Sequence, residues 1–210
     1  MASGEFAHVA HDFLGSAHVF ASAVEEVIEK HLLEEVAGKH LTLSQLRLLK
    51  LVALTDARTI SDVGLFLGVT NAAASKAVDK LVRRKLLRRQ EGRPDRREIR
   101  LSLTESSKSL LTAYEQKKER KLTAVFRGFT GDELKRTANL LDRLSVELVD
   151  HHRHGNEVCL ECGIYFRDQC LVRKLLSRQC FYMRNRIQQR RDLRALVKAP
   201  SGTGSPAAVP

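Results

Sequence analysis

The sequence predicts a mainly α-helical fold. A winged helix-turn-helix unit lies between long helices that form a dimerisation domain, and a short Cys-rich helical extension follows. A tight turn at Gly68 separates two segments whose apolar residues recur at helical spacing. A polar loop with Gly92 and Pro94 then separates two strand-like stretches. The remaining helical segments are long and need somewhere to pack, which favours a two-fold dimer.

The first expected helix covers residues 7–36, where apolar side chains recur three or four positions apart. Gly38 interrupts it. Thr42 or Ser44 is suited to cap a second helix, which carries Leu46 and Leu49 on an apolar face.

The helix-turn-helix comes next. Ser61 is expected to cap a short helix ending at Leu67, Gly68 suits the turn, and Thr70 is a good cap for the following helix. The apolar face of that helix is expected at Val69, Ala73, Ala77 and Leu81, widened by Val78 and Val82.

A β-hairpin and two long helices complete the pattern. Residues 98–103 alternate polar and apolar, as a half-exposed strand does, and the loop before them carries arginines. Thr104 is expected to cap a helix that runs to about Arg127. Thr130 and Glu133 form a capping box for the next helix. Its buried face is expected at Leu134, Leu141, Leu144 and Leu148.

The expected organisation has five parts: a dimerisation helix (1–41), the winged helix-turn-helix unit (42–104), further dimerisation helices (105–155), a basic Cys-rich metal-binding extension (156–198) and a disordered tail (199–210).

The order of these elements, together with three stretches of sequence, is typical of one protein family. The stretches are "LTLSQLRLLKLVA", "VTNAAASKAVDKLVRRKLLRR" and "GRPDRREIRLSLTESS". The most diagnostic part is the wing motif Asp95-Arg96-Arg97 in the third stretch. Residues 10–150 resemble the MarR family of winged-helix transcriptional regulators. The resemblance implies a homodimer that binds a pseudo-palindromic operator in double-stranded DNA. The chain after residue 155 lies outside it.

The resemblance also implies which residues meet DNA. Those expected at the major groove are Thr70, Asn71, Ala72, Ser75 and Lys76. Arg96 or Arg97 is expected to enter the minor groove, with Asp95 bracing the loop beside Arg93.

Physical chemistry points the same way. Small side chains at the front of the helix allow close approach to base edges, and Lys80 further back suits a phosphate. Because so few side chains there can read bases, DNA shape is expected to contribute to recognition. The alternative is that the basic helix end is simply solvated, since cations suit a helix C-terminus.

All four cysteines lie within one short stretch, at Cys159, Cys162, Cys170 and Cys180. A C-x2-C pair followed by glycine suits a metal-binding turn. An iron–sulfur cluster of the 4Fe-4S kind is favoured because it accepts irregular spacing. Structural zinc, a metal-free disulfide switch and four unrelated cysteines are the alternatives. We expect the favoured centre to sense redox state, oxygen or iron and so to modulate DNA binding.

Charge and missing motifs narrow the class of function. The formal charge is +11 and the sequence pI near 9.8, which favours a polyanionic partner. No phosphate loop, nucleophile elbow or HExxH motif is present, so we expect no enzyme. A dithiol redox enzyme would need a thioredoxin-like βαβ context. A constitutive regulator with a zinc site, or one that responds to a small aromatic effector, stays open.

We also expect a cytoplasmic protein, because the sequence has no signal peptide or membrane span. The extension carries much of the positive charge, with ten Lys or Arg and two Asp between 167 and 198. We expect this basic segment either to reinforce DNA binding or to lie against the acidic stretch of the first helix.

Overall fold

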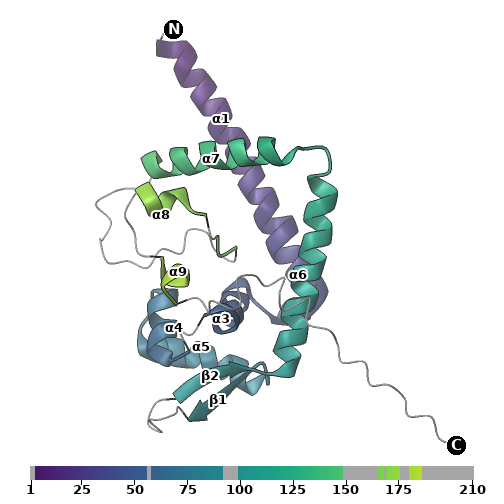
Figure 1. Ribbon diagram of the computed structural model, residues 1–210, viewed down its shortest axis with the longest axis vertical. Helices are drawn as coiled ribbons and strands as arrows, with labels where there is room; N and C mark the ends of the chain where they lie inside the picture. Colours follow the sequence, from purple (N-terminus) through teal and green to yellow (C-terminus); the bar gives the residue numbers. More distant parts are fainter. Residues whose placement is uncertain are drawn as a thin grey trace, which may run out of the picture.

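A computed structural model describes residues 3–55, 58–91, 99–148, 165–167, 169–175 and 180–185 (Figure 1). Their helices and strands are, in chain order, α1 (Ser3–Ala23), η1 (Val24–His31), α2 (Leu32–Ala37), η2 (Gly38–His40), α3 (Leu43–Leu54), α4 (Ile60–Leu67), α5 (Asn71–Arg83), β1 (Leu87–Glu91), β2 (Ile99–Leu103), α6 (Glu105–Val125), α7 (Gly131–Leu148), α8 (Leu171–Leu175) and α9 (Phe181–Asn185).

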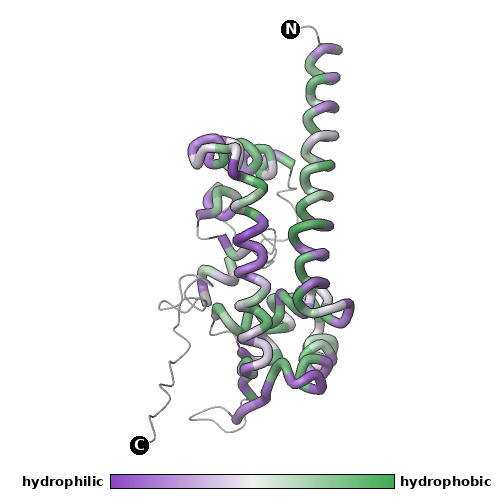
Figure 2. Tube along the Cα trace, turned by 90° about the vertical axis from the view of Figure 1, so that its right-hand side faces the viewer, coloured by the Kyte–Doolittle hydropathy of each residue, from purple (hydrophilic) through white to green (hydrophobic). Residues whose placement is uncertain are grey.

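The first three elements form one continuous rod. The backbone stays helical through Ala23 and His31, and the η1 segment between them is a π-helix. The rod ends at Gly38, which has φ 63°. The predicted helix 7–36 is therefore confirmed, with a few more residues at its start. The N-terminal half of α1 extends beyond the rest of the described chain, and Figure 2 shows it standing apart from α7.

Helix α3 begins where the sequence predicted. Of the two candidate caps, Thr42 is the one used: its hydroxyl accepts from the Gln45 N–H at 3.3 Å, and the Gln45 side chain accepts from the Thr42 N–H at 3.1 Å. This reciprocal pair satisfies two of the amide groups that a helix start leaves open.

The predicted cap of α4 is wrong. Thr59 caps this helix, and Ser61 lies inside its first turn. Asp62 lies three residues after Thr59, so its carboxylate accepts from the Thr59 N–H at 3.0 Å while the Thr59 hydroxyl accepts from the Asp62 N–H. Ser61 has no such partner in sequence, because a capping box needs an acceptor three residues on.

The turn and the next helix agree with the sequence. Gly68 adopts the left-handed conformation, φ 64° and ψ 34°, which glycine reaches without a steric cost. Thr70 then caps α5 by accepting from the Ala73 N–H at 3.3 Å.

The buried face of α5 agrees with the prediction in part. Val78 and Leu81 are fully buried, as predicted. Ala74 is also fully buried and was not predicted, whereas Val69 is 42% exposed and Ala73 is exposed. The prediction is therefore correct for the C-terminal half of the helix and wrong at its start, where Ala74 packs toward α4.

The predicted wing is confirmed as an antiparallel hairpin. Strands β1 and β2 pair from Leu87 opposite Leu103 to Glu91 opposite Ile99. Leu87 and Leu101 point into the core and are almost completely buried. Helix α3 is central to that core, since every residue from Leu48 to Leu54 is buried.

The long helices α6 and α7 follow the predicted bounds closely. Thr104 caps α6, and Thr130 with Glu133 forms the predicted capping box of α7. The predicted buried face of α7 is wrong for a single chain. Leu148 is 73% exposed, while Asp142 and Val146 are the buried residues.

The short helices α8 and α9 pack on different parts of the molecule. Helix α8 lies beside α7, and α9 lies near α3 and α4 (Figure 1). In the part of the chain that the structure describes, no helix is both long and apolar enough to cross a membrane.

Candidate nucleic-acid interface

The start of α5 presents an exposed surface of small and polar side chains. Thr70, Asn71, Ala72 and Lys76 are exposed, and Ser75 is partly buried. Neighbours with such short side chains let the helix backbone come close to the edges of bases in a major groove. The structure thus brings together the five residues that the sequence predicted for that role.

Gly64 holds this end of α5 close to α4, a feature that sequence reasoning missed. A Cβ atom on Gly64 would lie 2.9 Å from Asn71 Oδ1 and 3.1 Å from the carbonyl oxygen of Val69. Only glycine permits this approach without a shift. The sequence does contain a signal for this close approach. A glycine stands among the apolar residues of the predicted helix, just before the turn at Gly68.

The basic residues behind this surface fall into two groups. Lys80 and Arg83 are exposed on α5. Arg84 instead donates to the His40 carbonyl oxygen and, at 3.3 Å, to Gln45 Oε1. The side chains of the first group are therefore open to solvent, whereas Arg84 ties the end of α5 to the start of α3.

Arg89 on β1 joins the wing to the recognition helix. Its guanidinium lies 2.8 Å from a carboxylate oxygen of Asp79 and 3.3 Å from the Ser75 hydroxyl, both on α5. Neither Arg89 nor Asp79 was predicted as an interface residue. Their contact links the hairpin to α5.

The predicted wing residues Arg93, Asp95, Arg96 and Arg97 lie outside the described residues. The pairing of Glu91 with Ile99 shows that the segment carrying them joins the two strands at the end of the hairpin.

Two of the four cysteines of the predicted metal centre belong to the described residues. Cys159 and Cys162 lie outside the described residues. Cys170 precedes α8, and its sulfur accepts from the Arg173 N–H at 3.4 Å. Cys180 precedes α9 and packs against the core. Within the described ranges, no three His, Cys, Asp or Glu side chains gather closely enough to hold a metal ion.

A buried cation lies near the centre of the molecule. Lys50 is 1% exposed, and its ammonium lies 3.1 Å from Glu115 Oε1. Burial raises the pKa of the Glu115 carboxyl, but Lys50 and Lys118 outweigh this effect and hold that pKa below its ordinary value. Lysine is almost never buried unless paired, and its position in an otherwise apolar helix gave no sign of this pairing.

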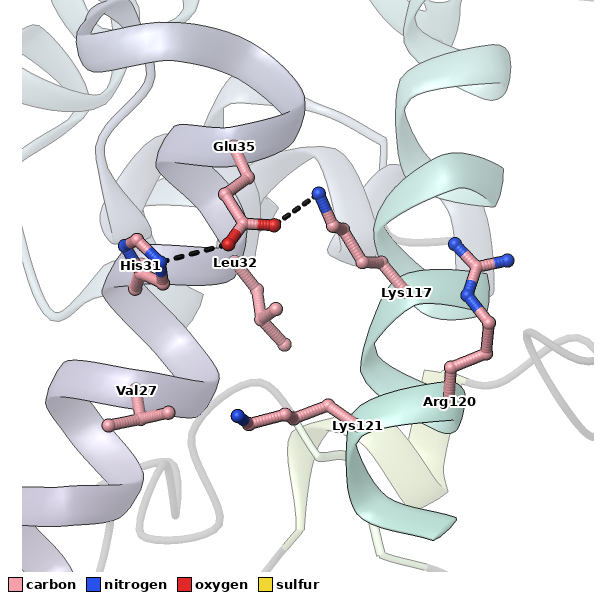
Figure 3. A pocket seen from close by; sticks show the side chains of 7 residues that line it. All are labelled: Val27, His31, Leu32, Glu35, Lys117, Arg120 and Lys121. Atoms are coloured by element: carbon pink, nitrogen blue, oxygen red, sulfur yellow. Dashed lines mark ion pairs between the residues drawn. The ribbon is translucent and has the colours of Figure 1, made fainter. Parts of the chain in front are cut away.

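A pocket of about 330 Å³ opens between the N-terminal rod and α6 (Figure 3). Glu35 lines one end of it, paired with Lys117 and, at 2.9 Å, with His31. The pKa of Glu35 is lowered, chiefly because Lys117 donates a hydrogen bond to it. The residues lining the pocket are Val27, His31, Leu32, Glu35, Lys117, Arg120 and Lys121.

The helix-turn-helix, its exposed small-faced second helix and the adjoining hairpin define a winged helix-turn-helix protein. The family model described as "MarR family" matches residues 41–98, which hold α3, α4, α5 and β1 of this unit but not β2. The resemblance of this part of the chain to the MarR family is thereby confirmed. A comparison with curated proteins finds no match.

Solved structures share the fold over a larger part of the chain. The MarR family transcription regulator SP03579 superposes with a TM-score of 0.57 at 19% identity, over 70% of this chain and 97% of its own. RV1404 from Mycobacterium tuberculosis gives 0.56 at 21% identity, over 64% and 91%. Staphylococcus aureus MarR in complex with salicylate and kanamycin gives 0.52 at 18% identity, over 70% and 97%.

Proposed function

We propose that the protein is a homodimeric transcriptional repressor of the MarR type that binds a pseudo-palindromic operator. The observation that carries this proposal is the exposed start of α5, where Asn71, Ser75 and Lys76 sit on a helix that Arg89 fixes to a wing. Two such units related by a two-fold axis match the two half-sites of a palindrome.

Exposed apolar surface supports the homodimer. Helix α1 carries Phe6, Val9, Phe13, Leu14, Val19 and Phe20, which are between 37% and 68% exposed. Leu140 and Leu148 on α7 are 48% and 73% exposed. Contiguous apolar patches of this kind mark interaction surfaces. A second copy of the chain covers them and gives the projecting end of α1 a packing partner.

Binding to DNA is tested with an operator selected from a random duplex pool, using fluorescence anisotropy at several salt concentrations. Two exposed cations on α5 (Lys80 and Arg83) in each protomer contribute a slope of about −4 in log K against log salt, at about −0.9 per phosphate. A flat salt response, or no enrichment of any sequence, would contradict the proposal.

Variants separate base reading from phosphate contact. Asn71→Ala and Lys76→Ala should relax the preference at particular bases, whereas Arg97→Ala should weaken binding to all sequences. Lys135→Ala is the matched control, because Lys135 is an exposed lysine on α7, away from α5. Loss of binding in the control equal to that in Lys76→Ala would show that the effect is merely one of net charge.

A second activity is favoured by the pocket next to α6. We propose that it takes a small aromatic carboxylate effector, since Lys117 balances Glu35 while Arg120 and Lys121 can face the ligand carboxylate, and Val27 and Leu32 can contact a ring. The complex of the S. aureus relative with salicylate supports a ligand of this class. Titration calorimetry with salicylate, with Lys121→Ala and the control Lys135→Ala, tests it; equal heats in all three proteins refute it.

We further propose that the four cysteines hold an iron–sulfur cluster, with zinc as the alternative. The support is their confinement to one short stretch and the basic residues around Cys170 and Cys180. Anaerobic purification with iron, sulfide and zinc analysis distinguishes the two metals. Metal-free protein that binds the operator equally before and after air exposure would remove this proposal and leave DNA binding standing.

A further inference from the structure

Three consecutive residues contact four helices, α3, α4, α6 and α7. They are Tyr165, Phe166 and Arg167. The Lys118 ammonium of α6 lies 5.8 Å from the ring centroid of Tyr165. Phe166 contacts α3 and α4, and Arg167 contacts α7. We call these residues the 165–167 junction. They lie in the extension that the MarR family model does not cover.

Phe166 is inserted into the core of the winged unit. It is 7% exposed, and its ring stacks on that of Phe66 in α4, with centroids 6.2 Å apart and planes at 10°. Tyr182 packs edge-on against its other side at 5.1 Å. The backbone of Phe166 has φ 50°, a conformation that costs energy for a bulky residue. Burial of the ring compensates for that cost.

The same ring covers the buried Lys50. The Lys50 ammonium lies 5.5 Å from the centroid of Phe166, within the range of a cation–π contact. Without the Phe166 ring, water would reach the pair of Lys50 and Glu115 from that side. Phe166 is therefore part of the core of α3, although more than 100 residues separate it from that helix in the sequence.

Arg167 attaches the junction to α7. Its two terminal nitrogens each lie 2.7 Å from an oxygen of Asp142, a bidentate pair. The Asp142 side chain is 9% exposed, and it also accepts from the Leu171 N–H at 3.4 Å. The pKa of Asp142 is lowered, chiefly by the hydrogen bonds from Arg167. One carboxylate thus holds both the junction and the start of α8.

Tyr165 adds a contact with α6. The Lys118 ammonium lies over its ring, and the residue itself is 39% exposed. Through Lys118 and Asp142 the junction contacts α6 and α7, of which α7 carries part of the apolar dimerisation surface. Through Phe66 it contacts α4, which packs against α5.

We propose that the 165–167 junction is an intramolecular coupler that fixes the winged unit relative to the dimerisation helices, and that its docking sets the affinity for DNA. This inference rests on the proposed function. Two recognition helices read two half-sites only when their separation is held, so a fixed winged unit binds without an ordering cost. Undocking of Phe166 frees α4, and with it α5.

The coupler also gives the cysteines a route to the DNA-binding surface. Cys170 adjoins Leu171, which donates to Asp142, and Cys180 is two residues before Tyr182, which packs on Phe166. A change at the Cys170 sulfur therefore acts next to a residue that shares the Asp142 carboxylate with Arg167, and a change at the Cys180 sulfur acts near a residue that packs on Phe166.

The test compares Phe166→Ala and Arg167→Gln with the control Phe129→Ala, which truncates a phenylalanine that is 58% exposed in the α6–α7 turn. Hydrogen exchange is measured on the protein alone, and operator affinity is measured separately. We expect faster exchange in α4 for both junction variants, and an operator affinity lowered by about fivefold or more, the lower end of typical coupling between sites. The control should change neither.

Arg167→Gln keeps the test valid if Phe166→Ala does not fold. The Arg167 side chain is 38% exposed, so its replacement opens no apolar cavity. If exchange in α4 and operator affinity both stay within twofold of the wild type, the coupler is refuted. If wild-type protein binds no DNA, the proposed function fails, while faster exchange in α4 of the variants still supports the junction as a coupler between the parts.

Discussion

Replacement of Glu115 by alanine tests how the buried charges stabilise the fold. Glu115 lies on α6, and its carboxylate faces Lys50 of α3 on one side and Lys118 on the other. The side chains of Lys50 and Glu115 are only 1% and 12% exposed. We expect Glu115→Ala to destabilise the protein strongly, and Lys50→Met to have a much smaller effect.

The magnitudes follow from what each change leaves behind. Removing one partner of a buried ion pair costs about 3–5 kcal/mol, because a charge is left in a medium that solvates it poorly. In Lys50→Met the Glu115 carboxylate is not left alone, because it still forms its ion pair with Lys118. Methionine also fills the volume and contacts the Phe166 ring favourably. We therefore expect about 3 kcal/mol for the first variant and about 1 kcal/mol or less for the second.

Urea unfolding at pH 7, at one fixed protein concentration, measures both free energies. The double variant Glu115→Ala with Lys50→Met should recover most of the loss, because neither charge is then left alone. Equal losses in the two single variants, or no recovery in the double variant, would refute the assignment of Lys50 and Glu115 as a coupled buried pair.

The same pair has a pH dependence with a defined sign. The pKa of Glu115 is lower in the folded protein than its ordinary value of 4.5, so its contribution is complete above that pH and is lost as pH falls through the folded pKa. The difference in stability between wild type and Glu115→Ala should shrink as pH is lowered from 6 toward 3. A difference that stays constant over that range contradicts the direction of the shift.

Other changes test local features of the fold. Gly64→Ala should lower the free energy of unfolding by about 1–3 kcal/mol, because the new Cβ meets the Val69 carbonyl oxygen at 3.1 Å. In the control Gly128→Ala the new Cβ meets nothing within 4 Å. Equal melting curves for the two variants would refute the tight approach at Gly64. Thr59→Ala should cost about 1 kcal/mol through loss of the α4 cap, whereas Ser61→Ala should stay within about 0.5 kcal/mol in thermal unfolding; the reverse order would restore Ser61 as the cap. Phe20→Glu on the exposed face of α1 should shift the protein toward monomer in light scattering, and an unchanged dimer mass would remove α1 from the interface.

What the sequence determined by itself was mostly set by neighbours a few positions apart. Gly68 and Thr70 were correctly predicted, and Thr42 was one of two candidates, because a cap or a left-handed turn depends on groups within about four residues. The cap of α4 is the exception, since Ser61 was predicted where Thr59 is used. The wing was predicted because strand alternation and a polar loop are also local. Asn71 and Lys76, which the family resemblance implied as groove-facing residues, are exposed on α5.

The tertiary structure decided the features that join residues far apart in the chain. Nothing around Phe166 in the sequence shows that it stacks on Phe66, and nothing around Lys50 shows that α6 brings it a carboxylate. The rotation of α5 about its axis and the identity of the α7 residues that are buried were likewise set by packing partners. The spacing of apolar residues specifies which face of a helix is apolar. Only the three-dimensional arrangement specifies which residues pack on that face. Those contacts join residues far apart in the chain, so they depend on the closure of long loops rather than on neighbouring residues.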